Sequence, residues 1–259
     1  MLRLLVIGIG CGNPDHMTMQ AIGALNKADI VLLPRKGEAK EDLAELRREI
    51  CSRFLTNPST RIVEFDLPQR DAQAPYLSAV DVWHGAIAET YRALLARELA
   101  NDGTAAFLVW GDPSLYDSTL RILERLRAAH DLAFDLEVIP GITSMQALAA
   151  SHRIPLNAVG NSILVTTGRK LKEGEMSEAD SVVVMLDGDT AFRTLPGDDY
   201  EIFWGAYLGL DREIVLAGDL SETAPKIAQA RTAAREKNGW IMDTYLLRKK
   251  RSEKPLLRK

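Results

Sequence analysis

The 259-residue chain is predicted to fold as two α/β domains, the first built on a mostly parallel sheet and the second on a mixed sheet. Two observations indicate this fold class. Short apolar runs alternate with amphipathic helical patterns in the first half, as in parallel α/β sheets. In the second half several strand-like runs follow one another, which favours an α+β arrangement. We therefore expect domains at 1–116 and 117–259, with an interdomain cleft near residues 111–118.

The first half contains apolar runs that enter glycines or polar loops, the pattern of buried parallel strands. Between them, apolar residues recur at helical spacing, as in Trp83, Ile87 and Tyr91. The longest loop signal, 66–79, is rich in Pro, Asp, Gln and Ala and is a candidate flap over a site. The predicted strands are 4–9, 30–33, 61–65 and 105–110, and the predicted helices start at 18, 38 and 80.

The second half has fewer helical patterns and more short strand-like runs. The predicted helices are 119–129, 144–152 and 223–236, and the predicted strands are 134–139, 162–167, 181–186, 202–208, 212–217 and 239–246. The segment 248–259 carries seven Lys or Arg residues and is interpreted as a frayed, solvated end.

Composition excludes several classes of protein. The net charge of −4 argues against a general nucleic-acid binder, because the phosphate backbone selects basic surfaces. Two cysteines, Cys11 and Cys51, cannot make a disulfide framework, and no Cys/His spacing resembles a metal site. The first apolar run ends at Gly8, too early for a signal sequence or a membrane span. We expect a cytoplasmic protein with no metal, no nucleic-acid partner and no membrane partner.

The first loop, GIGCGNP at residues 8–14, follows a strand and precedes a helix. A dinucleotide fingerprint would need a third glycine at 13 or 15, where the chain has Asn13 and Asp15. Three alternating glycines let the backbone pass close to a bulky ligand, although a tight strand-to-helix turn would need the same residues.

Two further loops follow buried strands. The loop 110–119 reads WGDPSLYDST, in which Pro113 keeps Asp112 out of helical geometry and presents its carboxylate at the strand end. The loop 138–144 reads VIPGITS and leads into a helix that Thr143 or Ser144 would cap. Amides at that helix start are suited to an anion. Each loop alone also fits an ordinary turn.

In this order and spacing, the three loops resemble those of the tetrapyrrole methylases. The resemblance implies a two-domain homodimer that holds S-adenosylmethionine in the interdomain trough, releases S-adenosylhomocysteine and methylates a tetrapyrrole. Within the family, the stretches 14–18, 110–121 and 152–157 are most similar to members that methylate C1 of precorrin-5 and release the acetyl group there as acetate. The alternatives are a sister methyltransferase acting at C11 without deacetylation, or an RNA or protein methyltransferase of the same fold.

The resemblance also implies site residues. Those implied to bind S-adenosylmethionine, the methyl donor, are Pro14, Gly111, Asp112, Leu115, Tyr116, Thr143, Ser144, Met185, Leu186, Ala206 and Tyr207. Basic candidates for the carboxylate arms of the substrate are Arg35, Lys36, Arg121, Arg153 and Arg169. Candidates for acid-base work at the acetyl group are His16, Tyr116 and Asp117. Any of these side chains would otherwise be a solvated surface group.

Overall fold

A computed structural model describes residues 1–35, 41–71, 73, 75–100, 102–129, 132–175 and 179–250. The chain divides into two compact units, Met1–Thr143 and Ser144–Lys259. The sequence suggested a division between residues 116 and 117. The structure places it later, because the strand formed by residues 134–139 pairs with the first strand of the chain and completes the first sheet.

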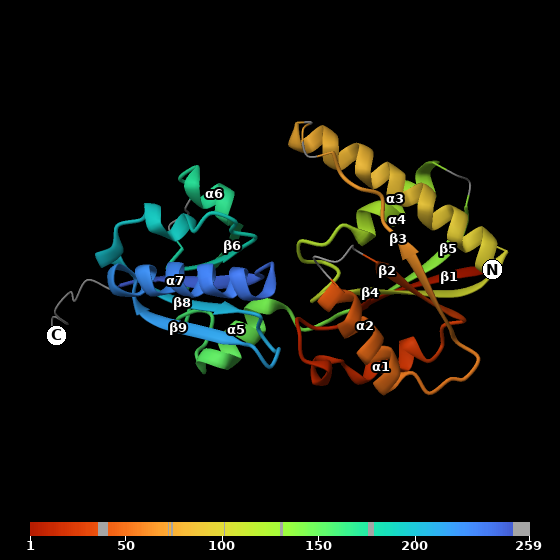
Figure 1. Cartoon of the computed structure of the whole chain (residues 1–259), viewed down its shortest axis with the longest axis horizontal. Helices are drawn as coiled ribbons and strands as arrows, with labels where there is room; N and C mark the ends of the chain where they lie inside the picture. The colour runs from red at the N-terminus through yellow and green to blue at the C-terminus, as the bar shows by residue number, and fades with distance from the viewer. Residues whose placement is uncertain are drawn as a thin grey trace. The chain divides into compact units, whose positions relative to one another are not determined.

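The first unit is a five-stranded sheet in which every pairing is parallel, with strand order β3-β2-β4-β1-β5. Helices α1 and α2 cover one face, and α3 and α4 cover the other (Figure 1). The prediction of a mostly parallel sheet is confirmed. The strands are β1 Leu2–Gly8, β2 Ile30–Arg35, β3 Arg61–Asp66, β4 Gly103–Val109 and β5 Phe134–Ile139. The helices are α1 Met19–Leu25, α2 Glu41–Phe54, α3 Tyr76–Leu99 and α4 Thr119–Ala129.

Central strands of this sheet are apolar on both faces because helices cover both. In β1, Leu4 and Val6 pack into the core beneath α3 and α4, whereas Leu5 and Ile7 pack against α1 and α2. Helix α1 begins where the sequence provides a cap. The Thr18 hydroxyl accepts a hydrogen bond of 3.0 Å from the amide of Ala21 at the start of α1.

The segment between β3 and α3 is shorter than the predicted loop 66–79, since α3 already begins at Tyr76. The indole Nε1 of Trp83 in α3 donates a 2.7 Å hydrogen bond to the carbonyl of Pro68. This bond ties the segment that follows β3 to the helix.

The second unit contains a mixed sheet, as predicted, and its strand order is β6-β7-β10-β8-β9. Only β6 and β7 pair in parallel, and the remaining neighbours are antiparallel. The strands are β6 Ile163–Thr167, β7 Ser181–Met185, β8 Tyr200–Ala206, β9 Ile214–Asp219 and β10 Asp243–Lys249. The helices are α5 Ser144–His152, α6 Gly168–Lys172 and α7 Leu220–Asn238, with 3-10 turns η3 Ala191–Thr194 and η4 Gly197–Asp199.

The last strand begins at Asp243, four residues after the predicted start at 239. Gly239 adopts a left-handed conformation, with φ of 72°, and caps the end of α7. The chain needs the next residues to turn from the helix into the sheet.

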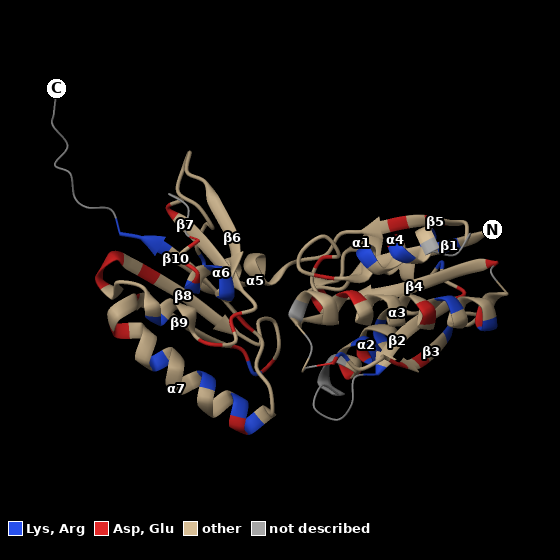
Figure 2. Ribbon diagram, turned by 90° about the horizontal axis from the view of Figure 1, so that it is seen from above, with Lys and Arg blue, Asp and Glu red and all other residues tan. Residues whose placement is uncertain are grey.

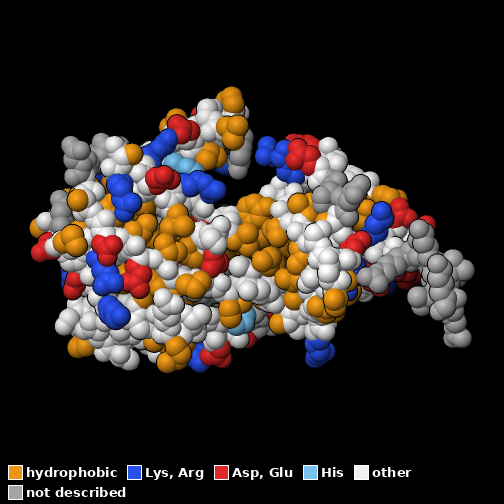
Figure 3. Space-filling view, turned by 180° about the vertical axis from the view of Figure 1, so that it is seen from behind, with side chains coloured by type: hydrophobic (Ala, Val, Ile, Leu, Met, Phe, Trp, Pro, Cys, Tyr) orange, Lys and Arg blue, Asp and Glu red, His pale blue; other side chains and the backbone are white. Residues whose placement is uncertain are grey.

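Acidic and basic residues both occur along α3 and α7 (Figure 2). The face drawn in Figure 3 carries hydrophobic side chains among polar and charged ones. Exposed large apolar residues include Leu77, Val82 and Leu186. Within the described part of the chain, no helix is long and apolar enough to cross a membrane.

Candidate active site

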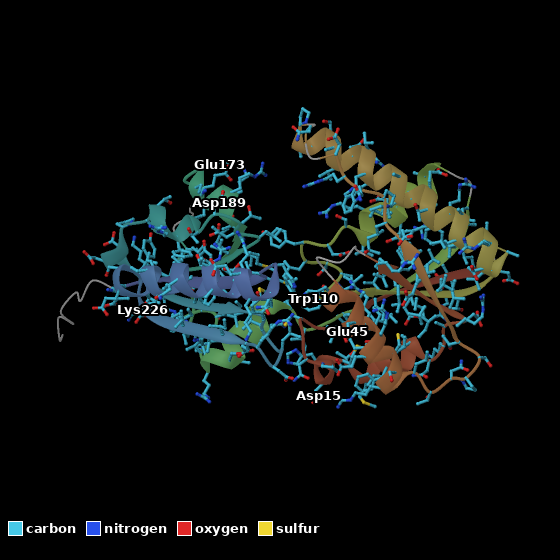
Figure 4. All side chains as sticks on the ribbon, viewed as in Figure 1. Asp15, Glu45, Trp110, Glu173, Asp189 and Lys226 are labelled. Atoms are coloured by element: carbon cyan, nitrogen blue, oxygen red, sulfur yellow. The ribbon has the colours of Figure 1, made fainter. Side chains whose placement is uncertain are left out.

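The three glycine- and proline-marked loops lie side by side in the first unit. They leave the carboxyl ends of β4, β1 and β5, which are neighbours in the sheet. This edge is where parallel sheets bind ligands. Trp110 and Asp15 mark the positions of two of these loops in Figure 4.

The backbones of these loops touch one another. A β-carbon built on Gly8 would lie 2.6 Å from the amide nitrogen of Gly141 and 2.8 Å from the carbonyl oxygen of Gly111. Gly10 and Gly111 also form an isolated bridge, in which the Gly111 amide donates to the Gly10 carbonyl at 2.7 Å. Glycine is therefore required because the three strand ends approach one another without room for side chains.

The edge is nevertheless open at Gly111 itself. Its φ is +68°, and a β-carbon there would meet only the Cα of Thr143, at 4.0 Å. A bulky ligand can therefore approach this backbone directly, which is the arrangement expected of a donor site.

Asp112 joins two of the loops. Its Oδ2 accepts a 2.8 Å hydrogen bond from the amide of Gly141, and its Oδ1 accepts one of 2.8 Å from the amide of Ser114 and another from the Ser114 hydroxyl. Burial alone would raise the pKa of Asp112, but these hydrogen bonds outweigh it and lower the pKa. The carboxylate thus fixes the geometry of the edge.

Replacing Asp112 with asparagine should weaken binding of S-adenosylhomocysteine by about tenfold or more. The side-chain NH2 of asparagine would face a backbone N–H that now donates a hydrogen bond to the carboxylate. Isothermal titration calorimetry measures this loss. Because the pKa of Asp112 is lowered in the fold, its contribution to stability is present near neutrality and is lost as the pH falls through that pKa. The asparagine variant should lack this part of the acid dependence.

The matched control is Asp102→Asn, an exposed aspartate at the opposite end of β4. It should leave the affinity for S-adenosylhomocysteine unchanged. Equal affinities for the Asp112 variant and this control would contradict the role assigned to Asp112.

The second loop ends in a strained residue and a helix cap. Tyr116 has φ of +52° and is 43% exposed, so neither backbone preference nor burial explains a tyrosine there. The Oδ1 of Asp117 accepts a 2.7 Å hydrogen bond from the amide of Thr119 at the start of α4. Arg121 donates to the carbonyl of Asp117 at 3.0 Å. Leu115, which directly precedes Tyr116, is half-buried.

A buried arginine, which the sequence reasoning missed, lies at the same edge. Strands β2 and β4 pair only from Ile30 to Leu32 and then separate. In the resulting fork, the Nε of Arg47 from α2 donates to the carbonyl of Leu108 at 3.0 Å, with only 8% of the residue exposed. Burial lowers the pKa of Arg47, and the nearby carboxylate of Asp117 opposes that effect. A charged side chain is thus held inside a largely apolar part of the unit.

The first loop contains a 3-10 turn, Pro14–His16, capped by the side chain of Asn13, which accepts a 2.9 Å hydrogen bond from the amide of Asp15. His16 packs on Gly10, where a β-carbon would lie 2.5 Å from that of His16. Pro14 and His16 are both half-buried, so the loop holds His16 against its own backbone.

In the second unit, two strand-end residues carry left-handed backbones. Leu186, with φ of 53°, follows β7, and Tyr207, with φ of 51°, follows β8. Leu186 is 66% exposed and Met185 half-buried. Ala206 and Tyr207 differ, since their side chains lie in the core and the Tyr207 hydroxyl donates to the carbonyl of Trp240. These two residues can reach a ligand only through the backbone.

A buried polar network supports the turn after β7. The Oδ2 of Asp187 accepts hydrogen bonds of 2.7 Å from the Ala191 amide and 2.7 Å from the Tyr245 hydroxyl. Its carbonyl accepts one of 2.6 Å from Arg231. The guanidinium of Arg231 also pairs with Asp243 at 3.0 Å, and both side chains are less than a tenth exposed.

The basic candidates are distributed over both units. Arg35 makes two hydrogen bonds, of 3.0 and 2.9 Å, to the carboxylate of Asp66. Arg153 follows α5 with φ of 57°, and Arg169 lies in α6. Lys36 lies outside the described residues. Among the described residues, no three His, Cys, Asp or Glu side chains are grouped as metal ligands.

The comparisons with known proteins agree with this geometry. Residues 3–224 match the family described as Tetrapyrrole (Corrin/Porphyrin) Methylases. The chain belongs to this family. A tetrapyrrole methylase from Sinorhizobium sp, precorrin-6A synthase (deacetylating), is 55% identical over 250 residues, covering 96% of each chain.

Two solved structures have the same fold. A cobalamin synthesis related protein (CobF) from Corynebacterium diphtheriae is 40% identical with a TM-score of 0.83, covering 96% of this chain and 98% of that chain. The uroporphyrin-III C-methyltransferase of Thermus thermophilus, in complex with S-adenosyl homocysteine, is 17% identical with a TM-score of 0.57, covering 95% of this chain and 91% of that one. The tetrapyrrole-methylase fold expected from the sequence is confirmed, and the chain is a methyltransferase.

Proposed function

We propose that this chain is a precorrin-6A synthase, which methylates C1 of precorrin-5 with S-adenosylmethionine and releases acetate, in aerobic cobalamin biosynthesis. The observation that carries the proposal is the 55% identity to the Sinorhizobium precorrin-6A synthase (deacetylating), which extends over 96% of both chains. A shared fold alone would not distinguish this reaction from that of a sister methylase.

When bound, S-adenosylmethionine supplies a methyl group that is already activated, so no protein nucleophile is needed. The residues of the chain then have to bind the donor, orient it and exclude water. In the first unit we assign this work to Pro14, Gly111, Asp112, Leu115, Tyr116 and Thr143. In the second unit we assign it to Ser144, Met185 and Leu186, and to the backbone of Ala206 and Tyr207.

The open backbone at Gly111 and the hydrogen bonds of Asp112 support the first part of this assignment. The exposed, left-handed Leu186 supports the second. Of the basic residues, we assign Arg35, Arg121, Arg153 and Arg169, with Lys36, to the carboxylate arms of the substrate. His16 and Tyr116 are proposed to line the substrate side of the loops.

The test is incubation of the purified protein with precorrin-5 and methyl-labelled S-adenosylmethionine. Labelled precorrin-6A, S-adenosylhomocysteine and acetate should form in equal amounts. Methylation without acetate would assign the chain to a sister enzyme, for example one acting at C11. Tight rRNA binding with a steep salt dependence would instead support an RNA methyltransferase.

We also propose that the protein acts as a homodimer in the cytoplasm, without a metal, a nucleic-acid partner or a membrane partner. The net charge of −4 supports the exclusion of nucleic acid. Light scattering coupled to size-exclusion chromatography measures the oligomeric state, and activity after treatment with a chelator tests for a metal.

A further inference from the structure

We propose that the fork between β2 and β4 is the pocket in which the acetyl group is cleaved, with Arg47 stabilising the oxyanion and Asp117 acting as the base for water. The inference rests on the proposed function, because only the deacetylating reaction releases acetate. It assigns residues to the step for which the sequence left three candidates open, His16, Tyr116 and Asp117.

The size of the cavity supports this assignment. The fork holds a cavity of about 100 Å³ lined by side chains of the first unit. A water molecule occupies about 30 Å³ in the liquid, so the space is suited to an acetyl group, which has three heavy atoms. It is much too small for a tetrapyrrole ring. The cavity therefore fits a substituent of the substrate.

The lining contains both kinds of side chain that an acetyl group requires. Leu32, Phe65 and Trp83 are apolar residues of the lining that can receive the methyl group. Arg47 and Asp117 line the same cavity, together with Ser118. The carbonyl of the acetyl group can therefore meet charged and polar side chains while its methyl group stays among apolar ones.

The guanidinium of Arg47 is held in place before any ligand arrives. Its Nε donates to the carbonyl of Leu108, which the separation of β2 from β4 leaves without a strand partner. This bond sets the plane of a group that carries five N–H donors. A preorganised donor in a site with little water is the arrangement that stabilises an oxyanion most strongly.

Asp117 is equally constrained. Its Oδ1 accepts a hydrogen bond from the amide of Thr119, and this bond fixes the side chain at the start of α4. Its carboxylate is also close enough to Arg47 and to the buried hydroxyl of Tyr91 to shift the pKa of both. A carboxylate fixed beside the oxyanion donor is in position to take a proton from water.

The step balances without any further reagent. Water loses a proton to Asp117 as its oxygen bonds to the acetyl carbonyl carbon, and the resulting oxyanion is held by Arg47. The bond between the acetyl carbon and C1 then breaks, and its electron pair stays on C1, delocalised into the macrocycle. Acetic acid leaves and ionises, the proton on Asp117 returns to solvent, and the C1 electron pair forms the new bond to the donor methyl group.

The experiment compares acetate and S-adenosylhomocysteine formation by the full-length wild type, Arg47→Ala, Arg47→Lys and Asp117→Asn. Loss of one oxyanion donor typically lowers kcat by about 10² to 10³. We expect such a loss for Arg47→Ala, a smaller one for Arg47→Lys, and partial recovery of Arg47→Ala with millimolar guanidinium chloride. The Asp117→Asn variant keeps an oxygen that accepts from Thr119 and so preserves the cap while removing the base.

The matched control is Arg48→Ala, which removes the neighbouring exposed arginine of α2 that pairs with Glu64. It should keep full activity, and all variants should bind S-adenosylhomocysteine within about twofold of wild type. In H2¹⁸O, the acetate released by the wild type should carry one labelled oxygen.

The two proposals can fail separately. A wild type that forms no acetate contradicts the proposed function. A wild type that forms acetate while Arg47→Ala and Asp117→Asn remain within threefold of it overturns the acetyl pocket alone. If Arg47→Ala does not fold by circular dichroism, Asp117→Asn and Arg47→Lys decide the question.

Discussion

Replacement of Gly141 by alanine should lower the free energy of unfolding of the first unit by about 3 kcal/mol or more and abolish donor binding. The added β-carbon would overlap the carbonyl oxygen of Gly111 and lie 2.8 Å from the carbonyl carbon and Cα of Gly8. These are backbone atoms at the ends of neighbouring strands, so they cannot rotate away as a side chain could. The strand ends would have to separate.

Urea unfolding followed by amide hydrogen exchange in the first unit measures this effect, and calorimetry measures the affinity for S-adenosylhomocysteine. The control is Gly23→Ala in α1, where a β-carbon would meet no atom within 4 Å. Because alanine has a higher helix propensity than glycine, the free energy of unfolding of that variant should rise by about 0.5 to 1 kcal/mol. Unchanged stability and affinity in Gly141→Ala would show that the loops can shift without consequence.

Replacement of Arg231 by methionine should destabilise the second unit by about 3 to 5 kcal/mol, because it leaves the buried carboxylate of Asp243 without its ion-pair partner. It also removes the hydrogen bond that the guanidinium donates to the carbonyl of Asp187. The turn that carries Leu186 should therefore loosen, and donor affinity should fall with stability.

The pH dependence separates this cause from a general packing defect. Burial raises the pKa of Asp243, and Arg231 partly opposes that effect. Since the folded state holds the proton of Asp243 more tightly than the unfolded state, protonated Asp243 contributes to the free energy of unfolding at acid pH. This contribution is lost as the pH rises through the folded pKa. The difference in free energy of unfolding between Arg231→Met and the wild type should therefore become smaller as the pH is lowered.

Chemical unfolding at several pH values tests this prediction. Lys226→Met is the control, because Lys226 is an exposed residue of the same helix, α7, and is labelled in Figure 4. It should change stability by less than about 0.5 kcal/mol at every pH. A stability gap that stays constant with pH would rule out an unpaired carboxylate as the cause.

The positions of most strands and the three loops were accessible from the sequence because local patterns determine them. Apolar runs and the glycine, proline and aspartate residues that follow them identify strand ends, and parallel pairing brings those ends together. The division between the units was less accessible. Nothing local to residues 134–139 says which sheet the strand joins, since that depends on its long-range pairing with β1.

Arg47 could have been found in the sequence. It lies three residues before Ile50 and four before Cys51, on the apolar side of the helical pattern in 38–53, where a charged residue is unusual. Its hydrogen bond to the carbonyl of Leu108 could not have been predicted from the sequence, because that bond depends on the separation of β2 from β4. The burial of Ala206 and Tyr207 could not be predicted either. Their position at the end of a strand suggested ligand contacts, but their side chains are buried by packing between elements that are distant in sequence.

Leu186, which we propose as a contact of the methyl donor, lies at a position that is unfavourable for a leucine. Its left-handed backbone would suit glycine, and an apolar side chain that is 66% exposed gains little from burial. A glycine at this position should make the chain more stable and the enzyme worse. Under this proposed role, selection for thermal stability alone would favour glycine in the turn after β7 and would thereby lower the activity.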